Sequence, residues 1–335
     1  MIPQPNQPEL QKLHHVHVAE PVTSRRLLWE RGRALMEASS LNHTPIGIRS
    51  REGDRLFDRF LAVVSWGLKM LGLYRRGVRN ALDIRLKTIE LTFPDLPRAF
   101  DGYRILHLTD LHLDSLPGLA RTVVASVAGA KANLCVLTGD YRAADDGPFD
   151  AVLGPMAELL SAVPTTDGVV GTLGNHDDHL MGRAFEDMGI TMLHNERLAL
   201  ERGEDRVILT GIDDVHRFYT PVADEALRGS VDGFAIALVH SPEMAEEAAA
   251  AGHALYLCGH THGGQICLPG GRPLVTHLTR NRALASGLWR CGKMIGYTGP
   301  GVGVSGLPVR YFTRGEATLF ILKSDCRHPL SSRST

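Results

Sequence analysis

The sequence predicts an α/β protein in which short buried strands alternate with helices. Three observations lead to this prediction: apolar runs of four or five residues recur along the chain, helical segments separate them, and the composition is globular. Of the 335 residues, 44% are hydrophobic and 22% are charged. These values exclude a disordered chain and a protein built from many membrane spans. The length is sufficient for about two domains.

The formal net charge of −1 conceals an uneven distribution. Lys and Arg total 36 against 37 for Asp and Glu, so the protein is not basic overall. From Val22 to Asn80, however, 12 basic residues stand against 5 acidic ones, a balance of +7, which leaves 24 against 32, or −8, for the remainder. This acidic remainder argues against a long nucleic acid as partner, because nucleic-acid binding depends on many phosphate contacts.

Residues 1–80 are expected to form a tail and a helical region that precede the main domain. The polar stretch 1–21 shows no periodicity, and we expect it to be a loose tail. A helix is predicted over Ser24–Ala38. Its apolar positions are Leu27, Leu28, Leu35 and Met36.

A second helix is predicted over Asp54–Tyr74. It contains the segment Phe60–Tyr74, fifteen residues in which Lys69 is the one charged side chain. Because a helix needs about 20 apolar residues to cross the hydrocarbon core, this segment is too short to span a membrane. It suits either a helix lying in the membrane interface or a helix packed on the main domain.

The main domain is expected to occupy residues 81–335. Alternating apolar residues predict a half-buried strand from about Leu86, and Arg197–Ile212 predicts a hairpin that turns at Gly203. Five uninterrupted apolar runs predict strands that helices bury on both faces. These runs are Ile105–Thr109, Leu134–Thr138, Val169–Leu173, Ala235–Val239 and Leu255–Cys258.

The cysteines bear on the cellular compartment. There are five, an odd number, and none forms a CxxC pair, so they indicate a reducing environment rather than a disulfide framework. We therefore expect a cytoplasmic protein, either free or held peripherally on the inner face of the cell membrane by its basic N-terminal region.

Each of the five buried runs is followed directly by side chains that can bind a metal ion. The carboxyl ends of strands form the ligand-binding edge of an α/β sheet, and imidazole, carboxylate and amide groups suit zinc, manganese or iron. Seven such side chains exceed one tetrahedral site, so two ions that share a carboxylate are the economical count. In chain order they are Asp110, His112, Asp140, Asn175, His240, His260 and His262.

Glycines and spacing support this grouping. Gly263 and Gly264 are expected to leave room for a phosphate beside the last histidine, and the pairs in Asp110–His112 and His260–His262 point to one side if the chain is extended there. Three further glycines precede ligand-type residues, where a missing side chain permits a sharp turn and a close backbone approach. They are Gly139, Gly174 and Gly259.

Taken together, these blocks resemble the calcineurin-like metallophosphoesterases. The matching motifs are Asp110-x-His112, Gly139-Asp140, Gly174-Asn175-His176-Asp177, His240 and Gly259-His260-Thr261-His262. The GHTHGGQ sequence, the glycine-rich Gly299–Gly306, Leu307-Pro308-Val309-Arg310 and an expected closing strand over Ala317–Leu322 resemble a bacterial, membrane-associated branch. That branch usually carries a clear transmembrane helix near its N-terminus, where this chain has the shorter segment Phe60–Tyr74.

The resemblance implies a four-layer α/β/β/α sandwich with two divalent metal ions. His176 would contact the phosphate and support or protonate the leaving oxygen, with Asp177 as its orienting partner. Water activated between the ions would attack phosphorus in line. The implied ligands of the first ion are Asp110, His112, Asp140 and His262. The second ion would share Asp140 and add Asn175, His240 and His260.

The implied activity is hydrolysis of a phosphodiester or pyrophosphate bond, with manganese, zinc or iron as the metal. A basic, apolar N-terminal region would place such a site at lipid headgroups, which favours an amphiphilic nucleotide such as UDP-2,3-diacylglucosamine of lipid A synthesis. The alternatives are a general phosphodiesterase or phosphatase on soluble substrates, and a non-catalytic, metal-stabilised interaction module at the membrane. The presence of Asp140, Asn175 and His176 favours catalysis over the last of these.

Other polar residues receive structural interpretations. His107 is expected in the core, and Arg142 either clamps a substrate phosphate or forms a salt bridge. Four further histidines lack a ligand-type context and are expected at the surface or at helix ends. They are His179, His194, His216 and His253.

Overall fold

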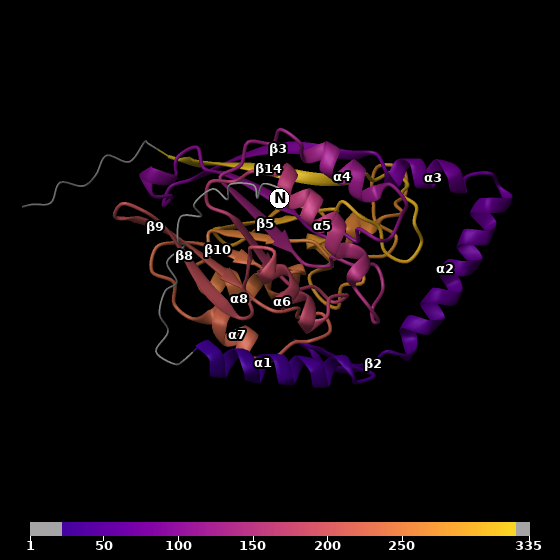
Figure 1. The fold of residues 1–335 in the computed structure, drawn as a ribbon, viewed down its shortest axis with the longest axis horizontal. Helices are drawn as coiled ribbons and strands as arrows, with labels where there is room; N and C mark the ends of the chain where they lie inside the picture. Colours follow the sequence, from indigo (N-terminus) through magenta and orange to yellow (C-terminus); the bar gives the residue numbers. More distant parts are fainter. Residues whose placement is uncertain (1–21, 326–335) are drawn as a thin grey trace, which may run out of the picture.

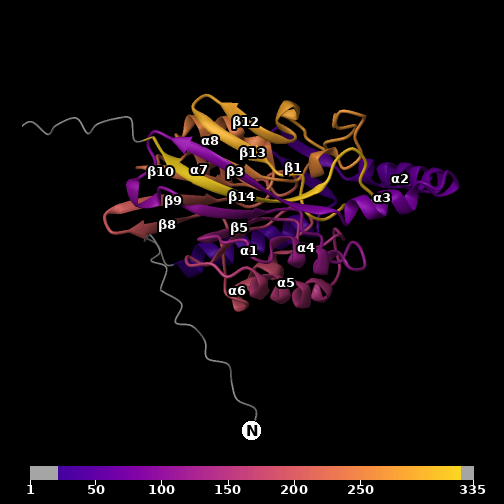
Figure 2. The ribbon, with the colours of Figure 1, turned by 90° about the horizontal axis from the view of Figure 1, so that it is seen from above.

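Two six-stranded β-sheets packed face to face form the centre of the protein. They are seen in a computed structural model, which describes residues 22–325. Helices cover the outer face of each sheet, so the layers follow the order α/β/β/α (Figure 2). This is the four-layer sandwich that the resemblance implied.

The first sheet is parallel at its centre. Its strands, in spatial order, are β3 (Ile84–Phe93), β14 (Gly315–Ser324), β4 (Arg104–Leu108), β5 (Leu134–Thr138), β6 (Val169–Thr172) and β7 (Ile190–Met192). β4 to β7 run parallel, whereas β14 lies antiparallel to β4 and parallel to β3. The carboxyl ends of β4, β5 and β6 therefore lie at the same edge.

The second sheet has the same parallel centre with an antiparallel hairpin at each edge. Its strands, in spatial order, are β12 (Gly287–Cys291), β13 (Met294–Thr298), β11 (Leu255–Cys258), β10 (Phe234–Leu238), β9 (Asp205–Gly211) and β8 (Glu196–Arg202). β8 and β9 form the predicted hairpin around Gly203. β9, β10, β11 and β13 run parallel.

Alternation along each strand divides its side chains between two cores. In β4, Ile105 points into the space between the sheets and its neighbour Leu106 points toward the outer helices. In β10, Ile236 and Ala237 divide in the same way. The strands are thus buried on both faces as predicted, but helices cover only one face. The prediction of helices on both faces is wrong, because the other sheet occupies the inner face.

Five helices complete the outer layers. α4 (Leu119–Val127), α5 (Asp150–Ala162) and α6 (His179–Asp187) cover the first sheet. α7 (Pro221–Arg228) and α8 (Ala245–Ala250) cover the second. Fully buried side chains such as Phe185 and Leu227 seal these contacts.

The N-terminal region runs along the outside of the sandwich (Figure 1). Its elements are α1 (Val22–Glu37), β1 (Leu41–Thr44), β2 (Gly47–Ser50), α2 (Glu52–Met70) and α3 (Tyr74–Ala81). α2 stands at the rim of the molecule, and α3 leads back to β3. Within the described residues, no helix has the length and apolar character needed to cross a membrane.

The predicted helix over Asp54–Tyr74 is two helices. The chain turns between Met70 and Tyr74, where Gly72 takes a φ of +69°. Glycine adopts this left-handed conformation without the steric cost of a side chain, which makes it the usual residue just beyond a helix end. The apolar segment therefore spans a helix end instead of filling one continuous helix.

In α1, several apolar side chains face solvent and several charged side chains face the protein, the opposite of the usual amphipathic helix. Leu28 and Leu35, predicted as apolar packing positions, are 70% and 75% exposed. Polar side chains dock the helix instead, and Arg183 of α6 donates to Glu30 with Nε and Oε1 2.7 Å apart. The prediction for His194 is wrong, because this residue is buried and lies at no helix end. His253 lies at a helix end as expected, where its Nδ1 is 3.1 Å from the carbonyl oxygen of Ala248 in α8.

The core between the sheets should dominate stability. We expect Leu257→Ala in β11 to lower the free energy of unfolding by about 2–5 kcal/mol, because it leaves a cavity among fully buried side chains. Leu288→Ala on the edge strand β12, where the side chain is 51% exposed, should change it by about 0.5 kcal/mol or less. Urea denaturation of both variants measures the difference; equal losses would contradict the assigned core.

Candidate metal centre

The predicted metal-binding residues meet where the carboxyl ends of both sheets adjoin. β4, β5 and β6 supply those of the first sheet, and β10 and β11 supply those of the second. All seven are buried. The apolar runs by themselves predicted a single sheet edge at this place. The structure builds the site across two sheets, which agrees with the sandwich that the resemblance implied.

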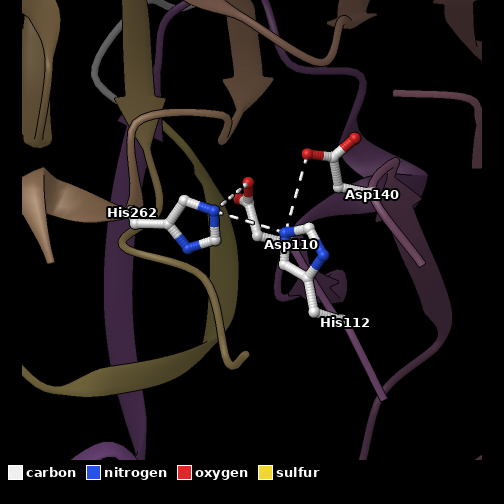
Figure 3. A group of neighbouring side chains, drawn as sticks. All are labelled: Asp110, His112, Asp140 and His262. Carbon is white, nitrogen blue, oxygen red and sulfur yellow. Dashed lines mark hydrogen bonds and ion pairs between the residues drawn. The ribbon is translucent and has the colours of Figure 1, made fainter. Parts of the chain in front are cut away.

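Four side chains form the first cluster. Their candidate ligand atoms all lie within 4.8 Å of one another. Nε2 of His112 is 3.3 Å from Nε2 of His262 and 3.6 Å from Oδ2 of Asp140. Asp110 completes the group, with Oδ1 3.5 Å from Nε2 of His262. Figure 3 shows the two rings directed toward each other and toward the two carboxylates.

The second cluster shares Asp140 with the first. His240 and His260 join it within the same 4.8 Å limit, and Nε2 of His240 is 3.3 Å from Oδ2 of Asp140. Oδ1 of Asn175 lies 2.8 Å from Nδ1 of His260 and 3.1 Å from Nε2 of His240. The structure thus gathers the two sets that the resemblance implied, with one carboxylate in common.

The backbone at this site is unusual. Among the described residues, positive φ outside glycine occurs at five of the seven predicted ligands: Asp110, His112, Asp140, His260 and His262. Each such residue costs on the order of 1–3 kcal/mol, and such strain concentrates at functional sites. The expectation of extended chain within Asp110–His112 and His260–His262 is therefore wrong. Left-handed turns bring these side chains together.

Two glycines allow the loops to approach the carboxylates. A Cβ at Gly259 would lie 2.1 Å from Oδ2 of Asp110, and one at Gly174 would lie 2.2 Å from Oδ1 of Asp140. Gly263 and Gly264 also stand in close contact with other residues. A Cβ added at either would lie 3.0 Å from Cβ of Pro300 and 2.5 Å from Cβ of Pro273, respectively.

The nitrogen and oxygen atoms that meet at this site are suited to binding cations. Nδ1 of His240 lies 2.7 Å from the carbonyl oxygen of Thr138. In a neutral ring that bond makes Nδ1 the donor and leaves a lone pair on Nε2. This lone pair faces acceptor oxygens of Asp140 and Asn175. Because converging lone pairs repel unless a positive charge lies between them, the residues fit bound metal ions.

The electrostatics agree with this interpretation. Burial lowers the pKa of His112 to about 4 and holds the pKa of His260 and His262 well below the usual range, so these rings are neutral and able to bind metal. His240 behaves oppositely. Burial opposes its charged form, yet the carboxylate of Asp140 prevails and raises its pKa to about 10. The site around Asp140 therefore favours added positive charge.

His176 lies beside the shared carboxylate, with Nε2 3.9 Å from Oδ2 of Asp140. Its other ring nitrogen, Nδ1, is 2.9 Å from Oδ1 of Asp145. Asp177 was expected to orient this ring, but its carboxylate instead accepts the backbone N–H groups of Asp140, Tyr141 and Gly174. The orienting contact comes from Asp145, and Asp177 fixes the loops that carry the ligands.

Arg142 fits neither of its predicted roles. Its guanidinium is engaged by carbonyl oxygens, with 2.7 Å from Nε to that of His176. His107 is buried as expected, with Nε2 2.8 Å from Oγ1 of Thr138. His179 lies at the start of α6, where its ring meets Glu37 of α1.

Two residues beside the site had no assigned role. The ring of His216 stands 4.1 Å from that of His260, and its Nδ1 is 3.1 Å from Glu243. His216 was expected at the surface or at a helix end, but its side chain is only 14% exposed and stands beside the site. It lies five residues after the end of β9, too far for the strand-end pattern to have indicated it. Arg310 is fully buried and donates to the carbonyl oxygens of His262 and Gly303, which no local pattern indicates.

Comparisons with known proteins agree on one family. Residues 103–264 match the family described as calcineurin-like phosphoesterase. The "Uncharacterized metallophosphoesterase YkuE" of Bacillus subtilis (strain 168) is 31% identical over 68% of this chain and 82% of its own length. The "Phosphodiesterase YaeI" of Escherichia coli (strain K12) is 31% identical over 67% and 79%. A Danio rerio "Transmembrane protein with metallophosphoesterase domain" is 28% identical over 73% of this chain and 59% of its own length.

The close approach at Gly259 gives a test of the first cluster. We expect Gly259→Ala to weaken metal binding at least about tenfold, because the added Cβ must displace the Asp110 carboxylate or the side chain of Thr109. Gly154→Ala in α5, where a Cβ meets nothing within 4 Å, is the control. Calorimetric titration with Mn²⁺ measures both; a Gly259→Ala protein that folds and binds normally would contradict the geometry.

Proposed function

Because the chain belongs to the calcineurin-like phosphoesterase family, we propose that it is a binuclear metal-dependent hydrolase that cleaves a phosphodiester or pyrophosphate bond. The observation that carries this proposal is the position of Asp140. Its carboxylate belongs to both side-chain clusters, which is the arrangement that a pair of bridged ions requires.

The first ion would be held by Asp110, His112, Asp140 and His262, and the second by Asp140, Asn175, His240 and His260. This mixture of nitrogen and oxygen ligands suits manganese, zinc or iron. Such a pair of ions lowers the pKa of water and stabilises both the attacking and the leaving oxygen of an in-line displacement.

His176 is the group proposed to act on the substrate itself. Its ring adjoins the shared carboxylate, and 13% of its side chain is exposed, so a phosphate oxygen can reach it. Asp145 holds Nδ1, which leaves Nε2 directed to the site, and Arg217 steadies Asp145 through a contact of 2.8 Å. His176 would hold the phosphate and give a proton to the leaving oxygen.

Separating metal binding from turnover tests this mechanism. We expect His176→Ala to keep both ions and to lose about 10²–10⁴ in kcat against a substrate with a poor leaving group, the usual contribution of a positioned acid. Asp140→Asn should bind both ions much less tightly than wild type, because Asp140 belongs to both clusters. Metal analysis and steady-state kinetics with Mn²⁺ measure these effects.

Three results would overturn the proposal or part of it. Wild-type protein that is fully active with one tightly bound ion would exclude the binuclear site. A His176→Ala enzyme with near-normal turnover would remove this residue from the mechanism. Wild-type protein that binds two ions yet cleaves no phosphomonoester, phosphodiester or pyrophosphate would leave a non-catalytic, metal-stabilised module.

The finer proposal concerns the membrane. Of the twenty large apolar side chains that are exposed among those described, twelve belong to residues 27–73. On α2 and the turn after it, Phe60, Val63, Trp66, Met70 and Leu71 are each more than half exposed. The slightly wider range Val22–Asn80 carries the +7 charge balance. Exposed apolar and basic side chains together suit a peripheral contact with anionic lipid.

A phosphoesterase site in a protein that also carries such a surface favours an amphiphilic substrate. We propose the pyrophosphate of UDP-2,3-diacylglucosamine, cleaved to a lipid monophosphate and UMP. This rests on the combination of a phosphoesterase site with the exposed apolar N-terminal region. A general phosphodiesterase on soluble substrates is the alternative, and the test below distinguishes the two.

Trp66, which is 65% exposed, is the point to perturb. We expect Trp66→Glu to weaken binding to phosphatidylglycerol vesicles by about tenfold or more, because it removes an apolar ring and adds a repelled charge, each worth about 1 kcal/mol or more. It should also reduce the preference in kcat/KM for the diacylated over the deacylated sugar nucleotide. Leu288→Glu, an exposed apolar site outside this region, is the control.

A point variant is preferred to deletion of the N-terminal region, because the deletion would also remove α1 and its fully buried Arg33. If the acyl chains confer no advantage on wild-type kcat/KM, the lipid substrate is excluded. Unchanged vesicle binding by Trp66→Glu would exclude the membrane contact.

A further inference from the structure

α1 lies outside the segment 103–264 that matches the family, yet it reaches the loop that carries Asn175 and His176. Arg33, in the middle of this helix, has no exposed surface. A fully buried arginine needs hydrogen-bond partners for its donors, because an unpaired charge in the interior is costly. The identity of those partners indicates what Arg33 does.

The Arg33 guanidinium contacts both ends of the loop formed by residues 174–177, which is called the catalytic loop below. Nη2 donates to the carbonyl oxygens of Asp177 at 2.8 Å and Gly174 at 3.1 Å. These two residues flank Asn175 and His176 in the sequence. One planar guanidinium therefore fixes the peptide groups on both sides of Asn175 and His176. Asn175 is a predicted metal ligand, and His176 is the proposed acid.

The rest of the guanidinium is anchored on three sides. Nη1 donates to the buried carboxylate of Asp213, and Nε donates to Glu37 at 3.0 Å. The ring of Phe218 lies 3.6 Å beneath the guanidinium carbon, a cation–π contact. These contacts leave the group little freedom to move with the loop.

A second side chain of α1 reinforces this anchor. Trp29, one helical turn before Arg33, donates from Nε1 to Oδ2 of Asp213 at 2.7 Å. Its ring stacks on His194 with the centroids 3.8 Å apart. Asp213 thus accepts hydrogen bonds from two inward-facing side chains of the helix. The following strand, β1, continues the contact, because the N–H of His43 bonds to the carbonyl oxygen of Arg217 at 2.8 Å.

The position of the loop matters because its members meet both clusters. Oδ1 of Asn175 lies between His240 and His260. The N–H of His176 donates to Oδ1 of Asp140 at 2.9 Å. A shift of this loop would move one ligand of the second cluster and the proposed acid together, and would leave Asp110, His112 and His262 in place.

We propose that Arg33 is a positioning residue for the catalytic loop. Through Arg33, α1 holds Asn175 and His176 in the place that the metal centre requires. This inference rests on the proposed function, since it assumes two ions at the clusters described. It concerns the chain's own residues and predicts a selective effect: loss of Arg33 should weaken the second metal site and spare the first.

The experiment uses the full chain with Arg33→Met and Arg33→Lys. Lysine keeps the charge for Asp213, but a single ammonium cannot reproduce the planar fork that reaches both loop carbonyls. Arg31→Met is the matched control, because Arg31 is an exposed residue of the same helix. Calorimetric titration with Mn²⁺ gives the two affinities, and hydrogen exchange of metal-free protein reports on residues 174–178.

The expected result is that Arg33→Lys and Arg33→Met bind one of the two ions about 10–100-fold less tightly, the usual effect of losing a group that orients ligands. The affinity for the other ion should change less than about threefold. Exchange at residues 174–178 should accelerate while the strands stay protected, and kcat should fall with little change in KM. Arg31→Met should match wild type in every measurement.

Several results would overturn the inference. Equal losses at both sites with lower protection throughout would make Arg33 a general stabilising residue, and unchanged affinities would remove it from the site. If Arg33→Met does not fold, Arg33→Lys and Trp29→Phe decide. Wild-type protein that binds only one ion would remove the proposed function as well. Two ions bound with wild-type affinities by both variants would remove this inference alone.

Discussion

The carboxylate of Asp140 is the constraint on which the rest of the site depends. It has to face two groups of nitrogen and oxygen ligands at once, from a backbone in the left-handed conformation. Its surroundings accommodate that demand. Gly174 gives it space, and the carboxylate of Asp177 holds its backbone N–H. Burying so many acceptor atoms together is stable only if positive charge is supplied, and the ligand arrangement provides the place for it.

The same requirement explains why the site needs two sheets. One sheet edge offers loops that point in a limited range of directions, whereas two adjoining edges surround a point from opposite sides. Asp110, Asp140 and Asn175 come from the first sheet, and His240 and His260 come from the second. The apolar core between the sheets therefore does more than stabilise the fold, because it sets the distance between the two halves of the metal centre.

α1 shows how a surface element can serve the interior and the exterior at once. Several of its polar side chains face inward, where Arg33 and Trp29 meet Asp213. Its leucines Leu28 and Leu35 face outward. Burying arginine inside and exposing leucine outside is unfavourable for a helix that only covers a core. The reversal becomes reasonable when the buried contacts hold a functional loop.

The sequence by itself determined the strands, the order of the motifs and the identity of the clustered side chains. These depend on local rules: apolar runs form buried strands, and residues directly after parallel strands share an edge. Only the tertiary structure decided how the site residues divide between the two sheets, that Asp145 rather than Asp177 meets the His176 ring, and that Arg33 reaches the loop from 141 residues away. Each of these is a contact between segments far apart in the chain. No periodicity or spacing encodes such contacts, because they arise when separate elements pack against one another.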